Sequence, residues 1–273
     1  MNGAKMSYQF LQKMLDDVIT LVGRVASTIK DKSFTVTEKH RPENIVTSSD
    51  ITSQRMLIEG LRGILPSCGF FCEEEGVCSD GEYVWVIDPI DGTANYSRGI
   101  DDCAISVALL HRGRVVLGVV RSIFREECYS ALLGGGAWLN GQPIRVSARR
   151  FEEGMLCTAM SLYKKEHAKA CSDIIYEAYM QCNDIRRFGS CAMELCYMAA
   201  GRCELYFEIR VFPWDYAAAL LILTEAGGIA RELADRELDF KGPTVMIGAN
   251  SRESYDRLAE IVNRHIISTP YED

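Results

Sequence analysis

The chain has 273 residues, of which 48% are apolar and 25% charged, a composition that excludes disordered and fibrous proteins. The net charge of −8 at pH 7 argues against a nucleic-acid partner, which would favour a basic face. No apolar run reaches the roughly 18 to 20 residues that cross a bilayer, and the start of the chain lacks the pattern of a secretory signal. The sequence therefore predicts a cytoplasmic protein with no membrane partner.

Eleven cysteines are spread along the chain, an odd number in segments that are otherwise typical of a protein core. This distribution favours free, buried thiols over a disulfide scaffold, which is typical of short secreted chains. The two densest groups, at residues 68–78 and 191–203, contain no C-x-x-C pair and have no histidine close by. A structural zinc site is therefore not expected.

Two helices are predicted at the start of the chain. Apolar residues recur at helical spacing over residues 7–30, and a second amphipathic segment follows Asp50 and runs to Leu65, before Pro66. Strands are predicted next, at 83–87, in a hairpin formed by 103–110 and 115–120, and at 127–132. The glycine run 134–136 and the turn at Asn140-Gly141 then indicate a subdomain boundary near residue 149.

The second half of the chain alternates strands and helices. Strands are predicted at 155–159, near 185, at 204–207 and at 244–248, and helices at 164–181, 190–200, 214–226 and from 251 onward. This order predicts an α/β (α+β) fold built as a layered sandwich of alternating helices and sheets. We expect an N-terminal α+β subdomain over 1–149 and a C-terminal α/β subdomain over 150–273, joined in one compact catalytic unit.

The segment 85–93 delivers two carboxylates, Asp88 and Asp91, from a predicted strand into a turn sharpened by Pro89 and Gly92. An Asp-Gly turn alone is ordinary, and the segment lacks the alternating ligands and closing Glu of an EF-hand. It also differs from haloacid-dehalogenase phosphatases, because Pro89 stands where their nucleophilic Asp would be. An acidic chain repels phosphate substrates unless cations reverse the local field, so the two carboxylates indicate a metal site.

The chain resembles the inositol monophosphatase family, whose signature D-P-[IL]-D-G-T followed by an aromatic residue is present at 88–93 and Tyr96. The segment WDYAAA at 214–219, which leads into TEAGG at 224–228, resembles the family's second signature. Further segments similar to that family are NIVTSSD at 44–50, FCEEE at 71–75 and RFGSCA at 187–192. The resemblance covers most of the chain, and it implies a sugar-phosphatase type of fold.

The resemblance also implies a site for two or three magnesium ions. Glu73, Asp88 and the carbonyl of Ile90 would hold the first ion, and Glu73 would also support a third. Asp88, Asp91 and Asp215 would hold the second. Elementary electrostatics agrees, since four carboxylates crowded together repel one another unless hard cations neutralise them. Most of these ligands belong to the predicted N-terminal subdomain, and Asp215 would complete the site from the C-terminal one.

Catalytic roles are implied for Asp50, Thr93 and the metal ligand Glu73. Thr93 and Asp50 match the pair that orients and deprotonates the attacking water in the family. Asp50 also stands at a predicted helix start, so the role of a plain N-cap is an alternative.

Substrate-binding roles are implied at two helix starts and one strand. The backbone amides of Gly92 and Thr93 would cradle the phosphate, because a helical turn that begins there presents free N–H groups. Glu208 matches a polyol-binding carboxylate, with an ordinary strand-end acid as its alternative. The segment expected to meet the hydroxyl face of the substrate consists of Gly189, Ser190 and Cys191.

These features predict magnesium-dependent hydrolysis of a small phosphorylated polyol or sugar by a metal-activated water, with inositol monophosphate as the first choice. Three departures from the family affect substrate contacts: Cys72, Ile100-Asp101, and Arg210, which follows Glu208 where glycine is frequent. Arg210 and Arg98 offer cations for a second phosphate or a carboxylate. Fructose 1,6-bisphosphatase and nucleotide 3′-phosphatase activities are therefore alternatives.

A non-catalytic phosphate-binding or protein-interaction relative is a further alternative. The complete set of motif carboxylates argues against it, since such a relative is expected to have lost at least one of them. The resemblance finally predicts lithium inhibition and a homodimer.

Overall fold

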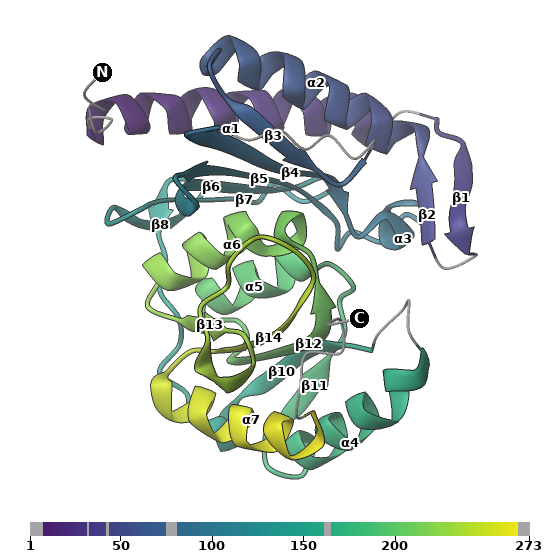
Figure 1. Cartoon of the computed structure of the whole chain (residues 1–273), viewed down its shortest axis with the longest axis vertical. Coiled ribbons are helices and arrows are strands. Elements are labelled where there is room, and N and C mark those ends of the chain that lie inside the picture. Colours follow the sequence, from purple (N-terminus) through teal and green to yellow (C-terminus); the bar gives the residue numbers. More distant parts are fainter. Residues whose placement is uncertain (1–7, 32, 42–43, 75–80, 161–164, 267–273) are drawn as a thin grey trace.

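The computed structural model describes residues 8–31, 33–41, 44–74, 81–160 and 165–266. Its helices and sheets alternate in layers (Figure 1). A helix pair covers a seven-stranded sheet, a second helix pair separates that sheet from a five-stranded sheet, and a third pair covers the far face. This order confirms the predicted α/β sandwich.

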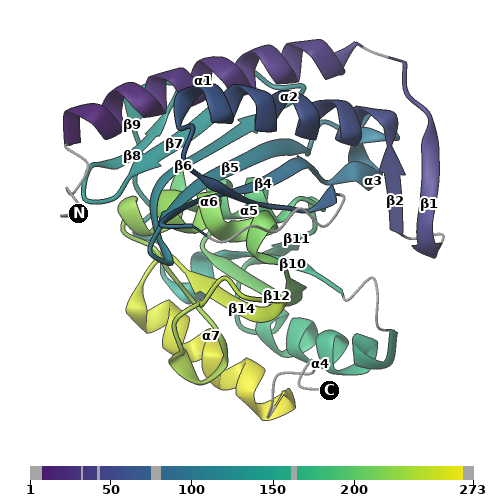
Figure 2. The same ribbon diagram turned by 45° about the horizontal axis from the view of Figure 1, so that its top comes forward.

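The first helix pair consists of α1 (Tyr8–Lys30) and α2 (Ser48–Ile64), which lie side by side on the seven-stranded sheet (Figure 2). The predicted apolar stripe of α1 is buried against that sheet. In the segment of chain that connects the two helices, β1 (Val36–Arg41) pairs antiparallel with β2 (Asn44–Thr47). The sequence did not predict this hairpin, because the charged residues of β1 leave no apolar alternation.

The seven-stranded sheet has the order β3-β4-β5-β6-β7-β8-β9. β3 runs parallel to β4, and the other neighbours are antiparallel. The predicted strands and hairpin are confirmed, whereas β3, β8 and β9 were not predicted because each has four residues or fewer. The strands are β3 (Gly69–Cys72), β4 (Tyr83–Asp91), β5 (Ala104–His111), β6 (Arg114–Ser122), β7 (Cys128–Leu132), β8 (Gly136–Leu139) and β9 (Gln142–Pro143).

The middle layer contains α5 (Cys191–Ala199) and α6 (Pro213–Glu225). Both are apolar nearly all round, because they are enclosed between the two sheets. Helix α6 lies very close to β6, since a Cβ atom on Gly118 would stand only 2.6 Å from the carbonyl oxygen of Ala218. Glycine at position 118 is therefore required for this packing.

The five-stranded sheet has the order β11-β10-β12-β14-β13. β10 (Met155–Ala159) runs parallel to β11 (Asp184–Arg186) and to β12 (Leu205–Val211). β14 (Thr244–Ala249) is antiparallel to β12 and to β13 (Ile229–Arg231). The outer helices are α4 (Ala168–Tyr179) and α7 (Arg252–His265). Short 3₁₀ turns occur at η2 (Phe151–Glu153), η3 (Lys165–His167) and η4 (Leu233–Asp235).

Two predicted elements differ in length from those observed. The helix predicted at 164–181 is the 3₁₀ turn η3 followed by the shorter α4, and residue 164 lies outside the described residues. Strand β12 continues past the predicted end at 207 to Val211, because Glu208 and Arg210 alternate with buried Ile209 and Val211. The subdomain division at residues 149 and 150 falls between the two sheets and stays a prediction.

The cysteines in the described part of the chain are free thiols, and most are buried, as predicted. None of the helices among the described residues combines the length and the apolar character needed to span a membrane.

Candidate active site

Strand β4 ends in a bulge that places Asp88 and Asp91 on the same side. Asp88 pairs with Ser106 of β5 and Asp91 with Ala104, so two residues on β4 stand opposite one on β5. In a regular strand, residues three apart point to opposite faces, and one extra residue restores a common direction. Both carboxylates consequently line one cavity of about 440 Å³, which we call the carboxylate cavity.

Two more carboxylates reach the carboxylate cavity from other elements. Glu73 follows β3, and its backbone N–H donates to the carbonyl of Ile87 at 3.2 Å, which places it beside the end of β4. Asp215 lies in the first turn of α6, where its Oδ2 accepts a hydrogen bond from the backbone N–H of Phe212 at 2.7 Å. The fold thus brings together the predicted ligands Glu73, Asp88, Asp91 and Asp215, with Ile90 in the same wall.

The four carboxylates destabilise one another's charged forms. Burial raises the pKa of Asp88 well above its ordinary value, and the charges of Glu73, Asp91 and Asp215 raise it further. Burial likewise raises the pKa of Asp215, with the charge of Asp91 as the next cause. The pKa of Asp91 rises to about 6 because burial outweighs its hydrogen bonds from Ser190 and the backbone. Neutralising cations would relieve this repulsion.

The donor set fits a hard cation. The four carboxylates and the Ile90 carbonyl supply oxygen ligands, the type that magnesium and calcium prefer. In the described part of the chain, no three His, Cys, Asp or Glu side chains are placed so that they could hold a metal ion as they stand. Asp215 is held by Phe212 and Asp91 by Ser190, so ion binding would require small reorientations of these carboxylates.

Asp50 and Thr93 form a hydrogen-bonded pair next to the carboxylates. The Thr93 hydroxyl lies 3.1 Å from Asp50 Oδ1 and 3.0 Å from the carbonyl oxygen of Ile90. Thr93 lines the cavity, whereas Asp50 is fully buried behind it. Asp50 Oδ2 accepts hydrogen bonds from the backbone N–H and the hydroxyl of Thr47, at 2.7 and 2.5 Å.

The alternative that Asp50 is an N-cap is wrong in position. Thr47 is the N-cap of α2, and Asp50 is the third helical residue of a capping box. One oxygen of the Asp50 carboxylate serves that box and the other faces Thr93. The structural role and the proposed catalytic role therefore use different oxygens of the same side chain.

Gly92 makes the turn after β4 possible. Its φ of +87° favours glycine, and a Cβ atom there would lie 3.0 Å from the carbonyl oxygen of Asp102 and 3.1 Å from that of Gly189. The helical turn α3 (Thr93–Tyr96) begins directly afterwards, as expected for a phosphate cradle. Its first backbone N–H groups have no acceptor within the turn.

The second half of the site is assembled at the start of α5. Ser190 is the N-cap of α5, and its hydroxyl donates to Asp91 Oδ2 at 2.5 Å. The backbone N–H of Ala192 donates to the same oxygen at 2.7 Å. Gly189 and Cys191 also line the cavity. The Ser190 side chain thus joins the two halves of the site by holding a predicted metal ligand.

Glu208 lies on β12 and lines the same cavity. The hydroxyl of Tyr206 lies 2.7 Å from Glu208 Oε2 and 3.1 Å from the sulfur of Cys191. Burial raises the pKa of Glu208 to about 7, although the Tyr206 hydrogen bond and the charge of Arg187 oppose this rise. Glu208 is half-buried, and its hydrogen bond with Tyr206 and its place in the cavity wall distinguish it from an ordinary solvated strand-end acid.

Two further residues of the cavity wall are Arg187, which the sequence analysis named only as part of the segment 187–192, and Glu194, which it missed. Glu194 is buried in α5, and its Oε1 accepts from the backbone N–H groups of Phe188 and Gly189 at 2.8 and 3.0 Å. The sequence feature that could have identified Glu194 is a single glutamate in an otherwise apolar helix. Arg98, by contrast, is exposed, donates to the carbonyl of Ala94 and is not among the residues that line the cavity.

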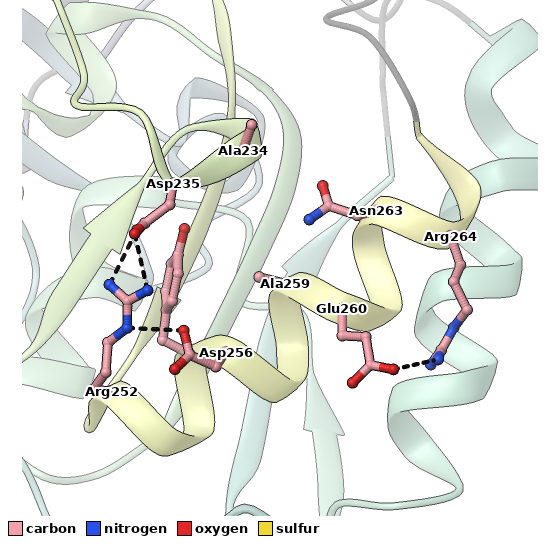
Figure 3. Close-up of a pocket in the computed structure, with 9 residues that line it drawn as sticks. Ala234, Asp235, Arg252, Asp256, Ala259, Glu260, Asn263 and Arg264 are labelled. Atoms are coloured by element: carbon pink, nitrogen blue, oxygen red, sulfur yellow. Dashed lines mark hydrogen bonds and ion pairs between the residues drawn. The ribbon is translucent and has the colours of Figure 1, made fainter.

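A second cavity of about 490 Å³ lies along α7 beside η4 (Figure 3). Its charged side chains neutralise one another, since Arg252 pairs with Asp235 and Asp256, and Arg264 pairs with Glu260. Ion pairs between exposed side chains are typical of a solvated surface. The carboxylate cavity is therefore the candidate active site.

Comparisons with known proteins agree with this geometry. The sequence profile of the inositol monophosphatase family matches residues 8–266. The Nus factor SuhB of Vibrio cholerae is 32% identical over 245 residues, which are 89% of this chain and 90% of that protein. The structure of the inositol monophosphatase (IMPase) of Thermotoga maritima superposes with a TM-score of 0.84 at 32% identity, covering 92% of this chain and 97% of that one.

The extragenic suppressor protein suhB of Bartonella henselae has the same fold, with a TM-score of 0.81 at 27% identity over 94% of this chain and 98% of that one. The profile match covers all described residues, including every segment that builds the carboxylate cavity. The chain belongs to the inositol monophosphatase family.

Proposed function

We propose that this protein is a magnesium-dependent phosphatase that hydrolyses small phosphate monoesters, with inositol monophosphate as the first candidate substrate. One observation carries the proposal. Four carboxylates line a single cavity whose wall also presents Thr93, hydrogen-bonded to the buried carboxylate of Asp50. This combination offers an ion site and a proton acceptor beside each other, as metal-assisted ester hydrolysis requires.

The same residues are proposed as metal ligands as in the sequence-based prediction. Glu73, Asp88 and the Ile90 carbonyl would hold one ion, Asp88, Asp91 and Asp215 a second, and Glu73 would support a third. Bound magnesium would neutralise the carboxylates and the substrate phosphate and would make a water molecule in the site more acidic.

The protein itself supplies the proton acceptor and the phosphate contacts. A water beside Thr93 donates a hydrogen bond to the threonine oxygen, while the threonine hydroxyl donates to Asp50 Oδ1. Through this pair of hydrogen bonds, a proton lost by the water is replaced on Thr93 as the threonine proton passes to the buried carboxylate of Asp50. The water oxygen bonds to phosphorus as the bond between phosphorus and the ester oxygen breaks, and the alcohol leaves as an alkoxide that takes a proton from solvent water. The backbone N–H groups at Gly92 and Thr93 bind the phosphate oxygens. Thr47 holds Asp50 Oδ2, which fixes the direction of the carboxylate.

On the alcohol side, Glu208 accepts a substrate hydroxyl. Tyr206 orients this half-buried carboxylate through a 2.7 Å hydrogen bond. The backbone around Gly189, Ser190 and Cys191 forms the adjoining wall. A small phosphorylated polyol or sugar matches this arrangement of one phosphate site and one hydroxyl acceptor.

Phosphate release from a panel of esters with magnesium tests the proposal. The panel contains inositol 1-phosphate, fructose 1,6-bisphosphate and adenosine 3′,5′-bisphosphate. We expect Asp91→Asn to lose at least about 100-fold in kcat, because it removes a charge that the reaction requires. Asp173→Asn is the matched control, since Asp173 is paired with Lys169 on the surface of α4. Equal activity of Asp91→Asn and wild type would refute the mechanism.

A protein-interaction role without hydrolysis is the second candidate, because several curated relatives carry the name Nus factor SuhB. A folded protein that releases phosphate from no ester in the panel would support this role. Family membership also leads us to propose a homodimer and inhibition by lithium. Sedimentation of the wild-type protein and phosphate release at millimolar lithium measure these two properties.

A further inference from the structure

The carboxyl ends of three parallel strands meet at the carboxylate cavity. β11, β10 and β12 are neighbours in the sheet, and the last residue of β10, Ala159, pairs with Glu208 of β12. Ala159, Arg187 just after β11, and Glu208 and Arg210 on β12 all line the cavity. In open α/β sheets, ligands bind outside the carboxyl ends of the strands, so this edge is suited to contact the substrate.

Arg187 presents a cation at this edge. Its side chain is exposed, and it forms no hydrogen bond or ion pair with the residues that the structure describes. Its charge is close enough to Glu208 to oppose the rise in the pKa of that carboxylate. The neighbouring Arg186, by contrast, is held by Asp184 outside the cavity. Glu194 fixes the backbone directly after Arg187 by accepting from the amides of Phe188 and Gly189.

Arg210 presents a second cation from β12. Its side chain lines the same cavity as that of Glu208, two residues earlier. Its guanidinium carbon lies 4.8 Å from the centre of the Phe212 ring. Phe212 in turn stacks on Trp214 at 4.8 Å, and Trp214 packs edge-on against Phe71 at 5.2 Å. A chain of aromatic contacts thus holds Arg210 in the cavity wall, which reduces the entropy lost when it binds a ligand.

We propose that Arg187 and Arg210 form a second anion-binding subsite at the alcohol end of the cavity. The preferred substrate is then a phosphate monoester whose alcohol part carries a hydroxyl group and a second anionic group, a phosphate or a carboxylate. This inference rests on the proposed phosphatase function, whose substrate class it specifies. Glu208 would accept the hydroxyl, and each guanidinium would donate to an anionic oxygen.

The charges at this edge favour an anion over a neutral polyol. Arg187 and Arg210 place two permanently protonated guanidinium groups in the wall of the cavity. The hydroxyl oxygens of a neutral alcohol also accept hydrogen bonds from a guanidinium, but the charge-assisted hydrogen bonds to a phosphate or a carboxylate are stronger. A cavity of about 440 Å³ is also within the size range of sites for sugar-sized ligands.

Measured kcat/KM values for three substrates test the subsite. Inositol 1-phosphate has a neutral alcohol part, fructose 1,6-bisphosphate carries a second phosphate, and 2-phosphoglycerate carries a carboxylate. Removing one charge-assisted hydrogen-bonding partner weakens binding by about 10- to 100-fold. We therefore expect Arg210→Met and Arg187→Met each to lower the ratio of kcat/KM for the better dianionic substrate to that for inositol 1-phosphate by at least about 10-fold.

Arg186→Met is the matched control, because it removes an adjacent arginine that does not line the cavity. Its ratio should equal that of wild type. Both kcat/KM values in a ratio come from the same protein sample, so a fraction of unfolded variant lowers both values equally and leaves the ratio unchanged.

The outcomes separate the two proposals. Hydrolysis of inositol 1-phosphate with a ratio unchanged in both variants would overturn the subsite and leave the phosphatase function standing. Hydrolysis of no substrate by the magnesium-loaded wild type would overturn both. A loss confined to fructose 1,6-bisphosphate would identify phosphate as the second anion, and a loss confined to 2-phosphoglycerate would identify carboxylate.

Discussion

Replacing Thr93 by valine tests the proton path directly. Valine keeps the shape of threonine but has no hydroxyl, and that hydroxyl lies 3.1 Å from Asp50 Oδ1 and 3.0 Å from the Ile90 carbonyl oxygen. A hydroxyl has one proton, so it donates to one of these two acceptors at a time. In the variant, the water in the site has no route to Asp50, which is buried behind residue 93.

The expected loss follows from the role of the pair. Proton transfer to a positioned base contributes about 10²- to 10⁴-fold, so kcat of Thr93→Val should fall by at least about 100-fold. The variant also leaves Asp50 Oδ1 without its partner, which destabilises the fold by about 1–3 kcal/mol. Domains of this kind are stable by about 5–15 kcal/mol, so nearly all molecules stay folded at 25 °C. Unfolding cannot then account for a 100-fold loss.

Phosphate release with saturating magnesium and inositol 1-phosphate measures kcat, and thermal unfolding followed by circular dichroism measures stability. Thr93→Ser is the matched control, because serine restores the hydroxyl without the methyl group and should keep activity within about 10-fold of wild type. A kcat of Thr93→Val within about threefold of wild type would refute the proton path. Equal losses in both variants would show that the methyl group, and not the hydroxyl, matters.

Three further predictions concern the close packing at Gly118, the hydrogen bond between Ser190 and Asp91, and the bound ions. Gly118→Ala should destabilise the protein by about 1–3 kcal/mol, seen as a lower Tm, because its Cβ would stand 2.6 Å from a backbone carbonyl of α6. Gly63→Ala is the control, since a Cβ there has nothing within 4 Å, and its Tm should not fall. Ser190→Ala should lower both Tm and kcat, because it removes the cap of α5 and the 2.5 Å hydrogen bond to Asp91. The expected loss in the free energy of unfolding is about 1–2 kcal/mol, and an unchanged Tm would contradict this prediction. Chelation with EDTA should abolish phosphate release and lower Tm, and added magnesium should restore both, since cations relieve the repulsion that raises the pKa of Asp88. Full activity after chelation would exclude the metal site.

Much of the candidate site was predictable because its residues lie in short, contiguous segments. Asp88, Asp91, Gly92 and Thr93 follow one strand, and a tight turn after a strand can be read from local sequence. The layered fold was predictable for a similar reason, since long amphipathic and buried segments show their periodicity. The polar hairpin β1–β2 and the short strands β3, β8 and β9 carry no such period, so backbone pairing alone reveals them.

The sequence by itself determined the carboxylates and their segments, but the tertiary structure decided how they face one another. A bulge in β4, visible only from its pairing with β5, turns Asp88 and Asp91 to the same side. The contact between Ser190 and Asp91 spans 99 residues, and the presence of Arg187 and Arg210 in one cavity wall depends on the order of the strands in the sheet. Contacts between distant segments arise from burial of the whole core, which no local pattern encodes.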